Sequence, residues 1–397
     1  MELHPVVADP PEVTCLSMLR QIPAHPMQRV HDGMVSSTDK GLVVLYTGTY
    51  RPGNGGNSWT GSYLVYDASS ASLSTVPQLD PPAAGRPFPV LPTIKCLGNS
   101  AAILRHSGEE EGAYVLAELV TTYHPGLPDA ELYLWRSPPA APAGSSDSGG
   151  GGGWTRTAAR LPLPPELCGP TCFFQIDMAF ALGVSRVCWV DLLAGVLICD
   201  LFAPQGPEFS FVPLPQGRSL HTPDNIRLEL KVQEFRSMGI VRGAIKFVGL
   251  IGYTEVSLSK SSDVVLETWT LSLDPEAEWK KGPAVRVGDL WASESFGKME
   301  LPRGRPPMFP VLSMDEDDIV YVFLNDIEFV DTADYFGQII GRQLVLNGHY
   351  LVGLDLVQNK VLYSKGGATN NLALLEPTLL ASDFSSYLHG SNSKDRV

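Results

Sequence analysis

Two cysteines beside one predicted hairpin are the clearest candidates for chemistry in this sequence. Cys188 and Cys199 lie in the stretch V-C-W-V-D-L-L-A-G-V-L-I-C-D-L-F. A four-residue loop with Gly195 at positive φ would place Cys188 opposite Cys199, and Trp189 opposite Ile198. Cross-strand neighbours project to the same face of a sheet. Two interpretations stay open: small apolar core side chains, the commoner outcome, or a redox-sensitive thiol pair.

A second cysteine pair, Cys168 and Cys172, has three residues between its members. A thioredoxin-type motif has two, and its attacking thiolate sits at the start of a helix. Phe173 and Phe174 follow here and favour a strand, so we expect loop cysteines. A zinc site needs two further ligands at suitable spacing. The histidines are scattered singly, at His4, His25, His31, His106, His124, His221, His349 and His389.

Acidic residues gather at a few points between predicted strands. The run Met314–Asp318 contains four acids, but it lacks the alternating ligands and the loop glycine of an EF-hand. We therefore interpret it as a solvated turn rather than a calcium site, and Glu109–Glu111 in the same way. Glu118 and Asp129 could in principle form a glycosidase pair, whose carboxyl groups lie about 5–9 Å apart. The sequence does not fix that separation.

The seven tryptophans mostly occupy predicted strand positions, where core packing is the expected role. Trp59 and Trp291 lie near predicted loops and could instead line a binding rim.

Catalytic and nucleotide-binding motifs are missing from the sequence. It has no G-x-S-x-G elbow, no G-x-x-x-x-G-K-[ST] loop and no strand-linked G-x-G-x-x-G. The run Gly149–Gly153 is followed by no helix that could hold an anion. We therefore assign no catalytic, cofactor-binding or metal residue, and we expect no cofactor.

The elements that would position these residues are short strands rich in β-branched and aromatic residues. Gly, Pro, Asn, Asp and Ser separate them, which is turn chemistry. Only Met178–Leu182 and Asp331–Gln338 suggest short helices. The strongest strand signals are Leu42–Tyr50, Ser62–Tyr66, Ala113–Val120, Glu131–Trp135, Arg186–Val190, Val196–Phe202, Ala244–Leu250, Val264–Leu273, Ile319–Leu324 and His349–Leu356.

A loose repeat joins an aromatic-rich strand, a turn with Asp and a second strand. It occurs near Tyr63, Trp189, Trp269 and Tyr350, at intervals longer than the ~50 residues of a kelch blade. The Pro-, Ser- and Gly-rich stretch 138–153 has too little apolar surface to fold. We interpret it as a disordered loop inside one domain; the alternative is a domain boundary near Gly150.

Composition sets the broad class. The chain has 397 residues, 44% of them hydrophobic, and a net charge of −14. Such an acidic chain repels phosphate backbones and anionic membranes, so we expect no nucleic-acid or membrane partner. We find neither a secretory signal nor an uninterrupted apolar stretch of about 18 residues. We therefore expect an intracellular protein, cytoplasmic or nuclear and not secreted, whose six cysteines are thiols.

The Trp189 hairpin also carries a family resemblance. Together with F-S-F-V-P-L-P-Q-G after it, it resembles the plant family catalogued as domain of unknown function 1618, which is expanded in grasses. F-R-S-M-G-I-V-R-G-A-I-K-F-V-G-L and T-W-T-L-S-L-D further along are similar to it as well. The resemblance covers residues 177–365. It implies a propeller-like module resembling those attached to F-box proteins, without an established activity; Met1–Lys40 does not have the pattern of an F-box.

These observations predict an all-β, irregular propeller-like domain of about five or six blades. The alternative is two β-sandwich-like units divided near Gly150. We expect an N-terminal extension over residues 1–40, partly disordered, one domain over 41–380 and a flexible tail over 381–397.

For function, the sequence favours a non-enzymatic module that binds a protein or peptide through loops on one face. The alternative is a small-ligand or carbohydrate-binding or carbohydrate-active propeller, with carboxylates and aromatic residues in a central pocket.

Overall fold

The computed structural model describes residues 2–6, 15–19, 34–47, 62–76, 100–105, 113–121, 130–137, 153–168, 173–220, 230–253, 258–274, 276–333, 335–336, 338–375, 379–384 and 386–387. The chain forms two compact units. Unit 1 comprises Met1–Leu230 and Ser382–Val397, and unit 2 comprises Lys231–Ala381.

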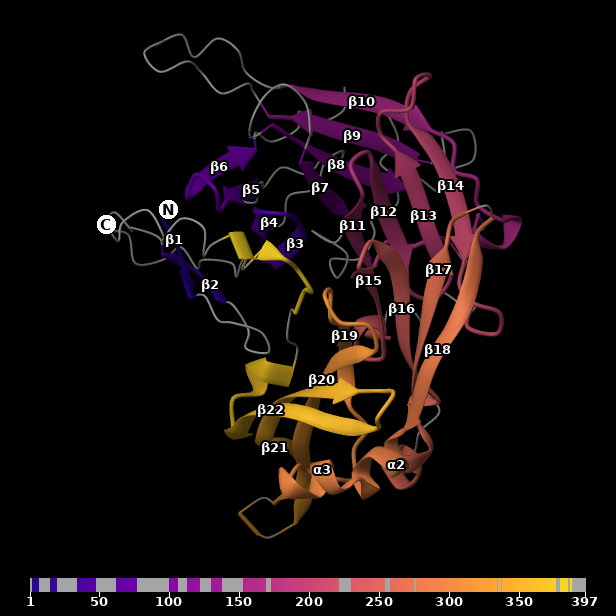
Figure 1. Ribbon diagram of the computed structural model, residues 1–397. Coiled ribbons are helices and arrows are strands. Elements are labelled where there is room, and N and C mark those ends of the chain that lie inside the picture. Colours follow the sequence, from indigo (N-terminus) through magenta and orange to yellow (C-terminus); the bar gives the residue numbers. More distant parts are fainter. Residues whose placement is uncertain are drawn as a thin grey trace, which may run out of the picture. The chain divides into compact units, whose positions relative to one another are not determined.

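Unit 1 is built from antiparallel sheets whose strands follow the order of the chain (Figure 1). Its described residues form one two-stranded sheet, three four-stranded sheets and the 3-10 turn η2 (Pro165–Leu167). The strands are β1 (Glu2–Val6) and β2 (Cys15–Leu19); β3 (Met34–Asp39), β4 (Leu42–Thr47), β5 (Ser62–Asp67) and β6 (Ser72–Val76); β7 (Ala101–Arg105), β8 (Tyr114–Thr121), β9 (Ala130–Arg136) and β10 (Trp154–Ala159); and β11 (Met178–Leu182), β12 (Arg186–Asp191), β13 (Gly195–Asp200) and β14 (Glu208–Pro213).

Unit 2 contains two further four-stranded sheets of the same kind within its described ranges. Its strands are β15 (Arg236–Val241), β16 (Ala244–Ile251), β17 (Val265–Ser272) and β18 (Glu278–Arg286), then β19 (Met308–Leu312), β20 (Ile319–Ala333), β21 (Ile339–Asp355) and β22 (Lys360–Ala368). Two short helices, α2 (Val287–Ala292) and α3 (Glu294–Lys298), join the sheets, and 3-10 turns are η3 (Val232–Glu234), η5 (Leu258–Asp263) and η6 (Leu372–Leu375).

A four-stranded antiparallel meander is the blade unit of a β-propeller. The described chain has five such sheets, three in unit 1 and two in unit 2. The expected all-β, propeller-like class is therefore confirmed, with five blades. Both suggested helices are wrong. Met178–Leu182 forms β11, and within Asp331–Gln338 the described residues 331–333 belong to β20 and residues 335–336 to a turn.

The apolar core of unit 1 lies between successive sheets. One cluster joins Val44 and Tyr46 of the first sheet to Ile103 and Leu116 of the second. Another joins Leu104 of the second sheet to Trp189 and other residues of the third. The first strands of the three sheets, β3, β7 and β11, also contact one another. Apolar burial on facing sheets is thus the main force that holds unit 1 together.

The Pro- and Gly-rich stretch does not separate two sheets. Strand β9 ends just before it and β10 begins just after it, and the two strands pair directly, with Trp135 opposite Trp154. A division into β-sandwich units near Gly150 would have to split this sheet. The stretch therefore connects the third and fourth strands of one blade; residues 138–152 themselves lie outside the described ranges.

The Trp189 hairpin has a tighter turn than the expected one. Asp191 pairs with Gly195, so the turn has three residues and Trp189 lies opposite Leu197 rather than Ile198. The carboxylate of Asp191 causes this, because its Oδ1 accepts hydrogen bonds from the backbone N–H groups of Leu193 and Ala194. A buried aspartate thus closes the turn from inside.

Gly195 is required for a reason other than the expected positive φ. Its φ lies outside the left-handed region. A Cβ atom there would lie 2.4 Å from the carbonyl oxygen of Val212 and 2.7 Å from Cζ of Phe211, both on the neighbouring strand β14. The glycine lets β13 and β14 approach closely.

Gly195→Ala should therefore destabilise the protein by about 1–3 kcal/mol, because neither the backbone of Val212 nor the ring of Phe211 can move freely. Urea unfolding would measure the difference. Gly239→Ala is the matched control, because a Cβ at Gly239 on β15 meets nothing within 4 Å. Equal stability of the two variants would show that β14 yields without cost.

Candidate functional site

The expected cross-strand pairing of Cys188 with Cys199 is wrong. In the observed register Cys188 lies opposite Ile198, and Cys199 lies opposite Val187. Side chains alternate between faces along a strand, so the two sulfurs lie on opposite faces of the sheet. Burial raises the pKa of the Cys199 thiol to about 12 and raises the pKa of Cys188 as well. Both behave as small apolar core residues.

The remaining cysteine pair is described only in part. Cys168 follows η2, is exposed, and its thiol donates to the backbone carbonyl of Pro164 at 3.5 Å. It also forms an isolated antiparallel bridge with Phe173, which fits the loop interpretation. Cys172 lies outside the described residues.

One acid of the run 314–318, Asp317, is paired with two cations. Asp317 accepts a hydrogen bond from Nζ of Lys246 at 2.6 Å and one from Nη1 of Arg242 at 2.8 Å. Arg242 also donates through Nε to the backbone carbonyl of Asp315. These contacts lower the pKa of Asp317, chiefly through the Lys246 bond. Among the described residues, no group of three His, Cys, Asp or Glu could hold a metal ion.

Glu118 is a fully buried acid at the centre of a hydrogen-bond chain in unit 1. Its Oε1 accepts from the hydroxyl of Ser100 at 2.6 Å, and its Oε2 accepts from the hydroxyl of Tyr63. The carbonyl of Ser100 accepts from the indole Nε1 of Trp189 at 2.7 Å. Trp189 and Tyr63 are also buried, so this carboxyl group is enclosed by protein and has no open face for a substrate. Asp129 lies outside the described residues.

Trp291 and His349, which were also considered from the sequence, both lie in unit 2. Trp291 lies on α2, half-buried, and its indole nitrogen has no hydrogen-bond partner among the described residues. His349 on β21 lies 2.6 Å from the Oδ1 of Asn325 through Nδ1 and stacks on the ring of Phe323. Burial lowers the pKa of His349. Trp59 lies outside the described ranges, so its rim position stays a prediction.

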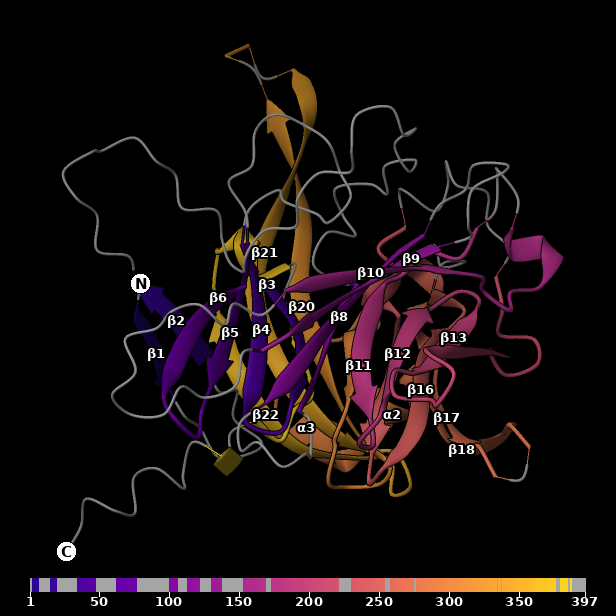
Figure 2. The ribbon, with the colours of Figure 1, turned by 90° about the horizontal axis from the view of Figure 1, so that it is seen from above.

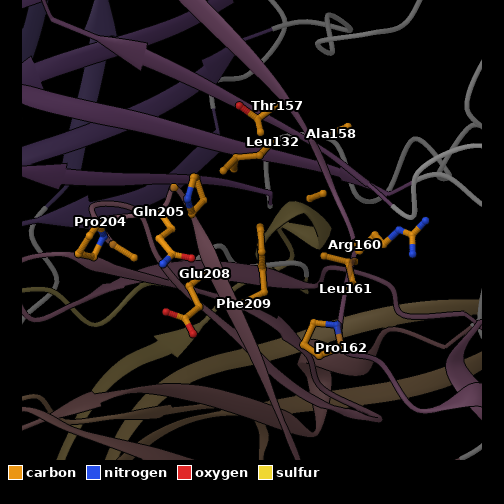
Figure 3. A pocket seen from close by; sticks show the side chains of 14 residues that line it. Leu132, Thr157, Ala158, Arg160, Leu161, Pro162, Pro204, Gln205, Glu208 and Phe209 are labelled. Atoms are coloured by element: carbon orange, nitrogen blue, oxygen red, sulfur yellow. The ribbon is translucent and has the colours of Figure 1, made fainter.

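An open groove of about 810 Å³ lies on unit 1 between the end of β10 and the loop from β13 to β14 (Figure 3). Its floor is apolar, with Leu132, Leu161 and Phe209, and prolines form much of its wall. Glu208 is the one carboxylate that lines it. Acid–base cleavage of a glycoside needs two carboxyl groups, so this groove lacks the expected pair.

The most distinctive feature of unit 2 is a long β-hairpin, which Figure 2 shows extending well beyond the other strands of its sheet. Strand β20 has 15 residues and β21 has 17. Strand β19 pairs with β20 only as far as Phe323, and β22 pairs with β21 only from Gly348 onward. Residues 327–346 therefore form a two-stranded ribbon, which we call the arm.

The tip of the arm, residues 335–340, exposes large apolar side chains. Tyr335 is 97% exposed, Phe336 85%, Ile339 67% and Ile340 70%. Closer to the sheet, the guanidinium of Arg305 lies 5.6 Å from the ring centre of Phe329, and Leu346 is buried. The arm therefore packs against Arg305 at its base and exposes apolar side chains at its tip.

Sequence reasoning missed the arm. It identified the strands Ile319–Leu324 and His349–Leu356, which are the parts of β20 and β21 inside the sheet, and it suggested a helix near the tip. The β-branched and aromatic residues in I-E-F-V-D-T and the apolar residues in the paired run Q-L-V-L-N-G were the signal available.

Comparison with known proteins supports the family resemblance. The model of a family described as "Protein of unknown function (DUF1618)" matches residues 189–321, within the range expected from the Trp189 hairpin onward. No curated protein matches the chain. No described helix is long and apolar enough to cross a bilayer.

Two solved structures show distant similarity. One is the periplasmic gluconolactonase PpgL of Pseudomonas aeruginosa, with 11% identity, 87% of this chain and 88% of that chain covered, and a TM-score of 0.36. The other is a candidate 6-phosphogluconolactonase of Bacteroides fragilis, with 8% identity, coverage of 83% and 82%, and a TM-score of 0.32. At these values neither similarity bears on activity.

The Glu118 chain predicts a clear stability effect. Tyr63→Phe removes a buried hydroxyl that donates to Glu118, and should cost about 1.5–3 kcal/mol of unfolding free energy. Tyr335→Phe is the matched control, because its hydroxyl is exposed at the tip, and it should change stability by less than about 0.5 kcal/mol. Equal urea midpoints for both variants would contradict a structural role for the chain.

The cysteine geometry predicts selective reactivity. In the native protein at pH 8, iodoacetamide should modify Cys188 and Cys199 at least about 100-fold more slowly than in the unfolded chain, because thiolates react and burial opposes ionisation. The exposed Cys168 should react readily. Peptide mass spectrometry would measure each site. A Cys188–Cys199 disulfide after mild oxidation would contradict the observed register.

Proposed function

We propose that the protein is a non-enzymatic interaction module and that the arm binds another protein. The exposed tip is the observation that carries this proposal. Large apolar side chains gathered on one projecting element mark an interaction site more often than a feature of folding. Aromatic side chains in particular act as anchors when a partner buries them.

The physics of a two-stranded ribbon supports the same proposal. An isolated hairpin is at best marginally stable in water, because it has no third strand or core to cover its faces. The arm is anchored at its base by the continuous strands β20 and β21 and by Arg305 over Phe329. The rings of Tyr335 and Phe336 contact each other edge to face, with centres 5.6 Å apart. These two side chains and those of Ile339 and Ile340 are nevertheless at least 67% exposed. A partner would give these side chains an apolar environment.

The alternative, a ligand-binding or carbohydrate-active propeller, gains no support from the described residues. Glu118 is enclosed in a hydrogen-bond chain, Asp191 closes a turn and Asp317 is paired with cations. The groove beside β10 has a single carboxylate. Glu118 and Asp317, which sequence reasoning singled out, thus have structural roles, and so does Asp191.

A four-site variant, Tyr335→Ser, Phe336→Ser, Ile339→Ser and Ile340→Ser, tests the proposal. Because these side chains are exposed, the thermal midpoint should hardly change, whereas affinity for an identified partner should fall by at least about tenfold. Photo-cross-linking from position 335 in extracts identifies the partner, and titration of the purified pair by calorimetry measures the affinity.

Val184→Ser with Val357→Ser is the control, since both residues are exposed and apolar but lie outside the arm. The proposal fails if the identified partner binds the tip variant and the control equally. Two results together would also contradict it: a thermal-shift screen finds a sugar or other small ligand that stabilises the protein, and the tip variant binds every partner as the wild type does.

A further inference from the structure

The segment that leads from the sheet to the tip carries negative charge; we call it the stem, and it comprises Asp326 at the base of the arm and the arm residues outside the tip. Between Asp326 and Gln343 the sequence has four acids, Asp326, Glu328, Asp331 and Asp334, against a single base, Arg342. Nε of Arg342 lies 2.9 Å from Asp331 and pairs with it. Asp326 and Glu328 are exposed, and neither has an ion-pair partner among the described residues.

Asp326 and Glu328 lie on one face of β20. They are two residues apart, and the bulge between Asp326 and Ile327 places its extra residue on β21, so the alternation along β20 is unbroken. The opposite face carries Phe329 beneath Arg305. The stem is therefore two-sided, with one face packed at its base and the other face acidic and uncovered.

The spacing between acids and tip sets the dimensions of a matching surface. At about 3.3 Å per residue, Glu328 lies roughly 20 Å along the ribbon from Tyr335. This exceeds the Debye length of about 8 Å at physiological salt, so charges at the mouth of an apolar pocket alone would not reach the acids. Complementary charge must lie beside the stem itself.

The charge of the arm argues against two other occupants. A second copy of this chain would bring another acidic arm, on a molecule whose net charge is −14, and like charges across an interface are unfavourable. An anionic bilayer would repel the stem for the same reason, although the tip alone could enter an apolar phase.

We infer that the partner is a protein with an apolar pocket for the tip and a band of Lys or Arg residues beside it for the Asp326–Glu328 face. This inference rests on the proposed function and adds the chemistry of the partner. The pocket supplies affinity by burying Tyr335 and Phe336, and the basic band fixes which face of the ribbon is bound and speeds the encounter.

Two synthetic amphipathic peptides of equal length, one of Leu and Lys and one of Leu and Glu, serve as defined probes. The wild-type chain should bind the Leu–Lys peptide at least about tenfold more tightly than the Leu–Glu peptide, because only the former offers apolar surface with basic flanks. Fluorescence anisotropy of labelled peptides measures both, and added salt should weaken the Leu–Lys complex.

Charge reversal locates the binding. Asp326→Lys with Glu328→Lys should reduce Leu–Lys binding about tenfold or more. The control, Glu276→Lys with Glu278→Lys, makes the same change of charge at exposed residues outside the arm in unit 2 and should bind as the wild type does. If the Lys variant misfolds by circular dichroism, Asp326→Asn with Glu328→Gln replaces it and should weaken binding in the same direction.

The outcomes separate the two proposals. If reversal of the stem and reversal of the control acids have equal effects, or if both peptides bind the wild type equally, the basic band is overturned and the arm remains a binding element. If the four-site tip variant binds both peptides and the cross-linked partner as the wild type does, the result contradicts the proposed function as well. Tip-dependent dimers in light scattering, or tip-dependent sedimentation with phosphatidylcholine vesicles, would overturn the choice of partner.

Discussion

The buried carboxyl group of Glu118 is the constraint on which unit 1 depends. Apolar packing between sheets is non-directional and would tolerate small shifts of one sheet against the next. The chain from Tyr63 through Glu118 and Ser100 to Trp189 joins residues of three sheets by hydrogen bonds, which need defined geometry. An unsatisfied buried acid would cost far more than one such bond contributes, so the three sheets must keep this arrangement.

The ten strongest strand signals in the sequence correspond to the second and third strands of the five sheets, from β4 and β5 to β20 and β21. These central strands have neighbours on both sides, and their apolar, β-branched residues reflect that burial. Outer strands such as β10, with mostly exposed residues, carry a weaker pattern. The fold class could therefore be predicted, whereas the limits of each blade depended on the less apolar strands.

The hairpin at Trp189 shows where local reasoning stops. A four-residue loop and a three-residue loop are both compatible with L-L-A-G, and the choice reverses the face on which Cys199 lies. The side chain of Asp191 fixes the three-residue loop because it accepts hydrogen bonds from N–H groups of the turn. Gly195 is needed because a side chain there would collide with Phe211 and Val212 on another strand. The Asp191 bonds are a local turn signal that the four-residue loop left out, whereas the Gly195 contact comes from a strand outside the hairpin. A one-residue error in the loop therefore turned core cysteines into a thiol pair.

The arm was missed for the opposite reason, because no core dictates its pattern. Inside the sheet β20 and β21 are buried, and their residues identify them as strands. Beyond Ile327 the two strands pair with each other and with no third described strand, and Arg305 packs over Phe329 at the base. A segment without a third strand gains little from burial, so its sequence is free to serve another purpose. A tip of aromatic and aliphatic residues on an acidic stem suits neither a core nor a solvated loop. Its composition is explained if the remaining contacts of the arm come from another molecule.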